Sequence, residues 1–125
     1  MFQDVFPILY AADVEGTVRF YCESFGFEVT YRWPPEGTLD FAFLRLGQLG
    51  IGVGTSERRG GGAPRFELCF EVEDTDAASA HLLALGVKQL QPPTDQPWGE
   101  RNAYFEDPDG NPIHVYAKER LDSAE

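Results

Sequence analysis

Residues 66–87 read FELCFEVEDTDAASAHLLALGV, an alternating segment followed directly by a capped helical one. In residues 66–72 apolar and polar side chains alternate, as in a strand with one buried face. Asp74 is a suitable helix N-cap, the helix continues to Leu85, and Gly86 ends it before a further strand at 87–90. This stretch therefore predicts a strand, a helix and a strand in succession.

The same pattern occurs earlier in the chain, with Asp13 as the N-cap and Gly26 as the residue that ends the helix. Strands are predicted in the first copy at 5–11, 27–33, 39–46 and 49–53, and in the second copy also at 102–106 and 112–116. The chain is thus predicted to be one domain of two tandem βαβββ units. The units span about 4–55 and about 65–118, and a glycine-rich linker joins them at about 56–64.

The length, hydrophobic content and net charge of the chain limit which classes of function are possible. The 125 residues suffice for one domain, and 42% of them are hydrophobic, which is enough for an ordinary core. With 21 acidic and 10 basic residues the net charge is -11, which repels phosphate and argues against a nucleic-acid partner. The acidic surface would attract a cationic small molecule, although it can also serve solubility alone.

The chain gives no sign of export or membrane insertion. No apolar run is long enough to span a bilayer, and no basic segment precedes the first apolar stretch. Cys22 and Cys69 lie far apart without a metal-binding spacing, so we expect reduced thiols. A cytoplasmic protein without a membrane partner is the expectation.

Three segments resemble the vicinal oxygen chelate superfamily, which includes glyoxalase I, extradiol dioxygenases, and fosfomycin- and bleomycin-resistance proteins. They are ILYAADVEGTVRFYCESFGFEV at 8–29, the stretch quoted above, and PWGERNAYFEDPDGNPIHVY at 97–116. The resemblance covers almost the entire chain. It implies an α+β fold whose two units form an open, barrel-like cleft, and a homodimer in which both subunits often build the clefts.

The resemblance also implies where a metal would lie. Metal enzymes of this superfamily carry ligands on the first and last strands of each unit, which correspond here to Phe6, Gly52, Glu67 and His114. Phe6 and Gly52 offer no donor, whereas a catalytic zinc, nickel or iron site normally has at least three protein ligands. We therefore expect no metal cofactor. A zinc, nickel, iron or manganese site with a third donor from elsewhere is the alternative.

Strand alternation places Glu67, Cys69 and His114 on the face of the second sheet that points away from the helix. Glu67 and His114 are expected to form a hydrogen-bonded pair or the polar wall of a pocket, and an acid–base role on a bound substrate stays open. Cys69 is included in the binding site, although a cysteine without an activating base is more often a small buried hydrophobe.

Three other motifs have structural interpretations. His81 is predicted to pack on its helix or lie at the solvent edge, and the glycine run lacks the lysine and hydroxyl residue of a phosphate-binding loop. The DPDG segment at 107–110 is predicted to form a β-turn, because it has proline at the second turn position and glycine at the last.

Aromatic residues carry the functional hypothesis, because rings with acidic neighbours suit a flat, partly cationic ligand. Trp98 is expected in a loop of the binding site, since residues 91–100 look too broken for a strand, although the ring could instead anchor that loop. The expected ligand-binding residues are Trp33, Phe41, Phe43, Glu67, Cys69, Trp98, Tyr104 and His114.

The resemblance is closest to the bleomycin-resistance branch, which has a Trp-Gly pair like Trp98-Gly99 before its penultimate strand. That branch sequesters its compound in a dimer without chemistry. It implies a metal-free protein that binds a small cationic or aromatic molecule and is not an enzyme. The alternative is a lyase, isomerase or dioxygenase that depends on a divalent metal.

Overall fold

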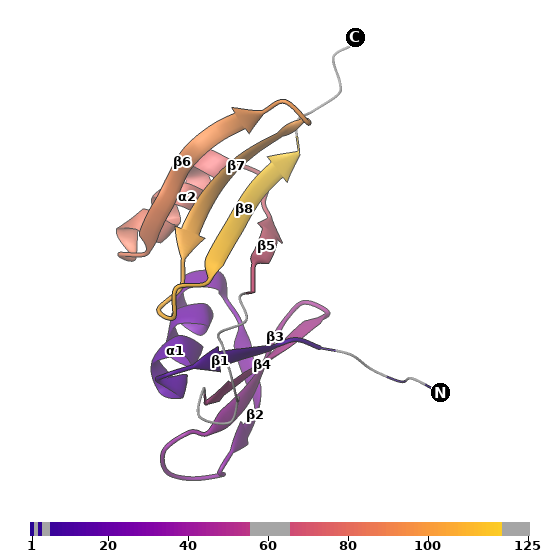
Figure 1. The fold of residues 1–125 in the computed structure, drawn as a ribbon, viewed down its shortest axis with the longest axis vertical. Helices are drawn as coiled ribbons and strands as arrows, with labels where there is room; N and C mark the ends of the chain where they lie inside the picture. The colour runs from indigo at the N-terminus through magenta and orange to yellow at the C-terminus, as the bar shows by residue number, and fades with distance from the viewer. Residues whose placement is uncertain (2, 4–5, 56–65, 119–125) are drawn as a thin grey trace. The chain divides into compact units, whose positions relative to one another are not determined.

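The computed structural model describes residues 1, 3, 6–55 and 66–118, and the predicted linker at 56–64 lies outside the described residues. The fold is α+β and consists of two compact units, Met1–Pro64 and Arg65–Glu125 (Figure 1). Each unit contains one helix and one four-stranded sheet, and neither sheet closes into a barrel. The predicted βαβββ order is confirmed in both units.

The first unit contains β1 (Ile8–Ala11), α1 (Val14–Phe25), β2 (Glu28–Trp33), β3 (Phe41–Leu46) and β4 (Leu49–Thr55). Its strands lie in the order β1-β4-β3-β2, with β1 parallel to β4 and the other pairs antiparallel. The second unit contains β5 (Leu68–Glu71), α2 (Thr75–Ala84), β6 (Lys88–Gln96), β7 (Glu100–Glu106) and β8 (Pro112–Lys118). Its strand order, β5-β8-β7-β6, repeats that of the first unit.

The helix ends follow the sequence signals. The carboxylates of Asp13 and Asp74 accept hydrogen bonds from the backbone N–H of Gly16 and Ala77, both at 3.1 Å. Gly26 ends α1 with a φ of 84°, a conformation that glycine adopts without strain. The helices therefore begin where the aspartates were expected to cap them.

Each unit buries one face of its sheet against its own helix. In the second unit Phe105, Ile113 and Val115 are buried on β7 and β8, which contact α2, and Leu82 of α2 is buried as well. In the first unit Leu9, Leu44, Val53, Val18 and Tyr21 form the corresponding core. The opposite face of each sheet is not covered by its helix, and it carries the alternate side chains of the same strands.

The sequence prediction was wrong for residues 91–96, which continue strand β6 instead of forming a loop. β6 is the outer strand of its sheet, so Pro92 and Pro93 need no ladder partner on the open side. The pairing register also shifts between Gln91 and Thr94, which absorbs the two prolines as an irregularity. The following strand starts at Glu100, two residues earlier than predicted.

The DPDG segment forms the predicted turn. The N–H of Gly110 donates to the carbonyl of Asp107 at 3.0 Å, and the Asp107 carboxylate accepts from the N–H of Asn111 at 2.8 Å. In the described part of the chain, neither helix has the length and the hydropathy to cross a bilayer.

Candidate functional site

The uncovered face of the second sheet gathers polar and aromatic side chains from β5, β7 and β8. His114 lies between Cys69 on one neighbouring strand and Tyr104 on the other, because both are its direct register partners. Asn102 pairs in the same way with Tyr116. We call this surface the acidic face and define it by Glu67, Cys69, Glu100, Asn102, Tyr104, His114 and Tyr116.

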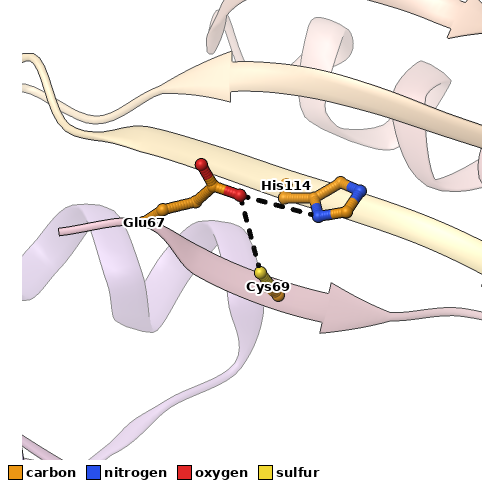
Figure 2. Close-up of side chains that lie close together, drawn as sticks. All are labelled: Glu67, Cys69 and His114. Atoms are coloured by element: carbon orange, nitrogen blue, oxygen red, sulfur yellow. Dashed lines mark hydrogen bonds and ion pairs between the residues drawn. The ribbon is translucent and has the colours of Figure 1, made fainter.

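Two carboxylates flank the His114 ring, one at each nitrogen. Nε2 lies 2.9 Å from Oε2 of Glu100. Nδ1 lies 3.7 Å from Oε2 of Glu67, and strand alternation predicted that Glu67 and His114 share this face (Figure 2). The side chains of His114 and Glu100 are each 14% exposed, whereas that of Glu67 is 44% exposed. The Nδ1 side of the ring is therefore the side that solvent and ligands can reach.

Asn102 fixes the buried side of this arrangement. Its Oδ1 accepts hydrogen bonds from the amides of Gln91 at 2.9 Å and Gln96 at 3.1 Å. The Asn102 Nδ2 therefore faces Glu100 and donates to its Oε2 at 2.7 Å. Burial would raise the pKa of Glu100, but hydrogen bonds from Asn102, His114 and the Trp98 side chain outweigh it and hold that pKa below its ordinary value.

The ionised Glu100 sets the hydrogen on the imidazole. A carboxylate only accepts hydrogen bonds, so the Nε2 atom that faces it carries a hydrogen. When His114 is neutral, its lone pair is then on Nδ1, toward Glu67 and Cys69. The acidic face thus presents a basic nitrogen beside a half-exposed carboxylate.

The thiol of Cys69 lies on the open side of the ring. Its Sγ donates to Oε2 of Glu67 at 3.7 Å (Figure 2). The pKa of Cys69 is raised above its ordinary value. Partial burial is the largest cause, and the negative charge and hydrogen bond of Glu67 add to it. The protonated thiol is therefore the form present at neutral pH. Cys69 itself is exposed, and the interpretation of this residue as a buried hydrophobe is wrong.

Two tyrosine rings lie beside His114 on the acidic face. The Tyr104 ring stacks on the imidazole, with centroids 4.8 Å apart and planes 10° apart. The Tyr116 ring, two residues further along β8, lies 5.2 Å from the imidazole and is tilted by 34°. Burial and the charges around it raise the pKa of Tyr104, so its hydroxyl stays neutral and can both donate and accept.

Trp98 lies next to this cluster, in the turn that joins β6 to β7. Its residue exposure is 67%, and its side chain hydrogen-bonds Glu100. The prediction that Trp98 lies in a loop is therefore confirmed, although this loop is shorter than the predicted one.

The first unit has a different uncovered face, which is aromatic. Phe41 and Phe43 on β3 lie over the glycines of β4, and a Cβ at Gly52 would be 2.9 Å from the Phe41 ring. A ligating side chain at position 52 would thus clash with this ring. We call this surface the aromatic face and define it by Phe6, Tyr31, Trp33, Phe41 and Phe43.

The residues expected at the ligand site fall into two groups, one in each unit. Trp33, Phe41 and Phe43 lie on the aromatic face, where Trp33 is 49% exposed. The remaining five lie on or beside the acidic face: Glu67, Cys69, Trp98, Tyr104 and His114. Sequence reasoning did not include Tyr31, Glu100 and Asn102 in the site, although alternation from Trp33 and Tyr104 reaches Tyr31 and Asn102. It placed Tyr116 on the same face as His114 but not among the ligand-binding residues.

The donor atoms of Glu67, Cys69 and His114 lie within 4.8 Å of one another, the single such group in the residues that the structure describes. Cys69 was not considered as a ligand, although it follows Glu67 by two residues and so shares its face. The four positions implied for a superfamily metal do not fit a metal site, because Phe6 and Gly52 supply no donor.

Comparisons with known proteins agree with this architecture. The sequence model of the Glyoxalase/Bleomycin resistance protein/Dioxygenase superfamily matches residues 5–115. The uncharacterized protein YraH of Bacillus subtilis (strain 168) is 31% identical in an alignment of 121 positions, which covers 86% of this chain and 92% of YraH.

Two solved structures share the fold. TioX from Micromonospora sp. ML1 superposes with a TM-score of 0.82 at 24% identity, over 93% of this chain and 99% of TioX. Lactoylglutathione lyase from Agrobacterium tumefaciens superposes with a TM-score of 0.74 at 22% identity, over 91% of this chain and 92% of the lyase.

Proposed function

The chain belongs to the Glyoxalase/Bleomycin resistance protein/Dioxygenase superfamily, and we propose that it is a binding protein that captures a flat, cationic aromatic compound without a metal. One observation carries the proposal. The His114 imidazole lies between the carboxylates of Glu67 and Glu100, and the Tyr104 ring stacks on it. This arrangement offers a ring surface and negative charge at the same place, which is the combination that a cationic aromatic molecule requires.

Glu67 is the carboxylate that would pair with the ligand. It is 44% exposed and lies 3.7 Å from His114, whereas Glu100 is engaged by Asn102, His114 and Trp98. A ligand cation can therefore reach Glu67 without breaking the buried network. The net charge of -11 adds a general attraction for cations, and salt would screen that part.

The second unit also offers an exposed ring for the same ligand. Trp98 is 67% exposed and lies beside Glu100. We assign the charged group of the ligand to the acidic face and propose Tyr104 and Trp98, in the same unit, as its stacking partners. In the first unit Tyr31 and Trp33 are 53% and 49% exposed, and the aromatic face there is a separate apolar surface.

Calorimetry with proflavine, a planar cation, tests this proposal. Anthracene carboxylate is the matched control, because it is planar and apolar but carries the opposite charge. We expect proflavine to bind and the anionic control to bind at least tenfold more weakly. Equal affinity for both compounds would contradict the assignment of the acidic face.

We also propose that the chain is a homodimer, as the superfamily resemblance implies. Size-exclusion chromatography with light scattering at micromolar concentration tests this directly. A mass near twice 14.0 kDa is expected, and a monomer would contradict the dimer.

A lyase, isomerase or dioxygenase that uses a divalent metal is the second candidate. The close approach of Glu67, Cys69 and His114 favours it, since three donors and an open position are the usual composition of a catalytic metal site. Against it, the ring of Phe41 fills the space at Gly52, and Phe6 has no donor. Ligand capture that survives treatment with a chelator favours the binding protein over this candidate.

A further inference from the structure

Two hydrogen-bond acceptors face each other on the open side of the acidic face. Nε2 of His114 lies 2.9 Å from the Glu100 carboxylate and 3.3 Å from Nδ2 of Asn102. The contact with Glu100 is shorter and charge-assisted, so Nε2 carries the hydrogen of the neutral imidazole. Nδ1 then has a lone pair, and it lies 3.7 Å from Oε2 of Glu67, an oxygen that only accepts (Figure 2). This pair of acceptors has no hydrogen between its two atoms.

The neighbouring thiol leaves this gap open. Sγ of Cys69 donates to Oε2 of Glu67 at 3.7 Å, so its hydrogen points at the carboxylate and not at the imidazole. The Glu67 side chain is 44% exposed, and Cys69 is exposed as well. A donor group of a ligand can therefore reach the gap from solvent.

The 3.7 Å between Nδ1 of His114 and Oε2 of Glu67 suits a nitrogen that carries at least two hydrogens. A nitrogen about 2.9 Å from both acceptors would have them about 80° apart. Two N–H bonds that diverge by about 110–120° can then reach both atoms with N–H···acceptor angles of about 150° or more, as good hydrogen bonds require. A fully methylated nitrogen can carry the same charge, but it has no hydrogen to donate.

We infer that the acidic face selects cations whose charged group is an N–H donor, such as a primary ammonium, an amidinium or an amino-substituted aromatic ring, over quaternary ammonium and other N-methylated cations. The inference rests on the proposed function, because it specifies the charged group of the same ligand. One ligand nitrogen donates to Nδ1 of His114 and to Oε2 of Glu67 at once. A site built for N–H donation rejects an analogue without the hydrogen, because its acceptors are left unpaired.

Nitrogen NMR of the imidazole tests the starting point without any ligand. The chain has two histidines, so the variant His81→Gln leaves His114 as the single source of imidazole signals. At about pH 8.5 the neutral ring should carry its hydrogen on Nε2, and Nδ1 should show the chemical shift of an unprotonated nitrogen. A hydrogen on Nδ1 would overturn the inference, because Glu67 would then already have a donor.

Calorimetry with two dyes of equal charge tests the selection itself. Proflavine has primary amino groups, whereas its N-methylated analogue, in which every N–H is replaced by N–CH₃, keeps the rings and the positive charge. We expect proflavine to bind roughly tenfold more tightly or better. Equal affinity, or tighter binding of the methylated dye, would overturn the inference and leave the proposed capture of cations standing. Binding of neither dye would contradict the proposed function, and the inference with it.

Variants separate hydrogen bonding from the bulk of the added methyl groups. His114→Gln keeps an amide near the position of Nε2 and removes the Nδ1 acceptor, so the preference for proflavine should fall below about threefold. Glu67→Gln should also reduce the preference, because its amide can itself donate to Nδ1. Glu28→Gln removes an exposed carboxylate in the other unit, and this matched control for charge should keep the full preference.

The circular dichroism spectrum of each variant shows whether it folds. If His114→Gln does not fold, Glu67→Gln decides, since its side chain is half-exposed. A preference that persists unchanged in the folded variants of His114 and Glu67 would assign the discrimination to methyl bulk and overturn the inference. A preference lost equally in Glu28→Gln would overturn it too, because charge alone would then explain the result.

Discussion

Nε2 of His114 lies 2.9 Å from Oε2 of Glu100, and this contact determines which side of the imidazole faces a ligand. Asn102 and Trp98 hydrogen-bond the same carboxylate, which keeps Glu100 ionised and engaged. The opposite nitrogen, Nδ1, is left toward Glu67 and solvent. The orientation of His114 on the acidic face therefore depends on its contact with Glu100 and on the buried Asn102 behind it.

We predict that Asn102→Ala destabilises the fold. Asn102 is 1% exposed. Its removal takes away hydrogen bonds from three side chains, namely those of Gln91, Gln96 and Glu100. The expected loss in free energy of unfolding is about 1–3 kcal/mol. Urea denaturation measures it, with exposed Gln48→Ala as a control that should stay within about 0.5 kcal/mol of the unsubstituted protein. Equal stability of both variants would contradict the role of Asn102.

The packing of the aromatic face predicts opposite outcomes for two neighbouring glycines. A Cβ at Gly50 would lie 2.5 Å from the Phe43 ring, whereas one at Gly54 would lie 3.5 Å from the Phe41 ring, an ordinary contact. Gly50→Ala should therefore cost about 1–3 kcal/mol, while Gly54→Ala should be neutral or stabilising by up to about 1 kcal/mol. Thermal unfolding compares them, and a loss of stability in Gly54→Ala as large as in Gly50→Ala would refute this account of the rings.

Some parts of the site followed directly from the sequence. Alternation along 66–72 and 112–116 was enough to place Glu67 and His114 on one face, because side-chain direction in a strand depends only on position. Asn102 lay inside the predicted strand 102–106 and on the face of Tyr104, but Glu100 was missed for a different reason. Two prolines hid the continuation of β6, and the following strand was predicted to start at Asn102, which left Glu100 in a loop.

The environment of Cys69 could not be predicted from spacing alone. The sequence shows that Cys69 shares a face with Glu67, but the hydrogen bond between them depends on the rotamers of both side chains. The same limit applies to Trp98, whose contact with Glu100 requires the turn between β6 and β7 to have its observed length.

The pKa of Cys69 predicts how its alkylation depends on pH. The negative charge and the accepting oxygen of Glu67 stabilise the thiol and so contribute to raising its pKa. Glu67→Gln should lower that pKa, so a larger fraction is thiolate at a given pH and iodoacetamide reacts faster. The rates should be measured against pH in a Cys22→Ser background, where Cys69 is the remaining cysteine. A profile that stays in place or moves to higher pH would contradict the effect of Glu67.

Trp98 should contribute to ligand capture more than to stability. Its ring is 67% exposed, so Trp98→Ala should leave the melting temperature within about 4 °C. Loss of the stacking partner should weaken proflavine binding by about 1–3 kcal/mol, and Trp98→Phe should recover part of it. If Trp98→Ala unfolds the protein at ordinary temperature, the ring anchors the turn and the binding role fails.

The most direct test of the central claim is calorimetric titration of proflavine into protein that has been treated with a chelator and then freed of it. Metal-free capture predicts saturable binding, weaker at higher salt and at least tenfold weaker in Glu67→Gln, while added Zn²⁺ brings no gain. No binding at millimolar proflavine, or binding that returns only after Zn²⁺ is restored, would contradict it.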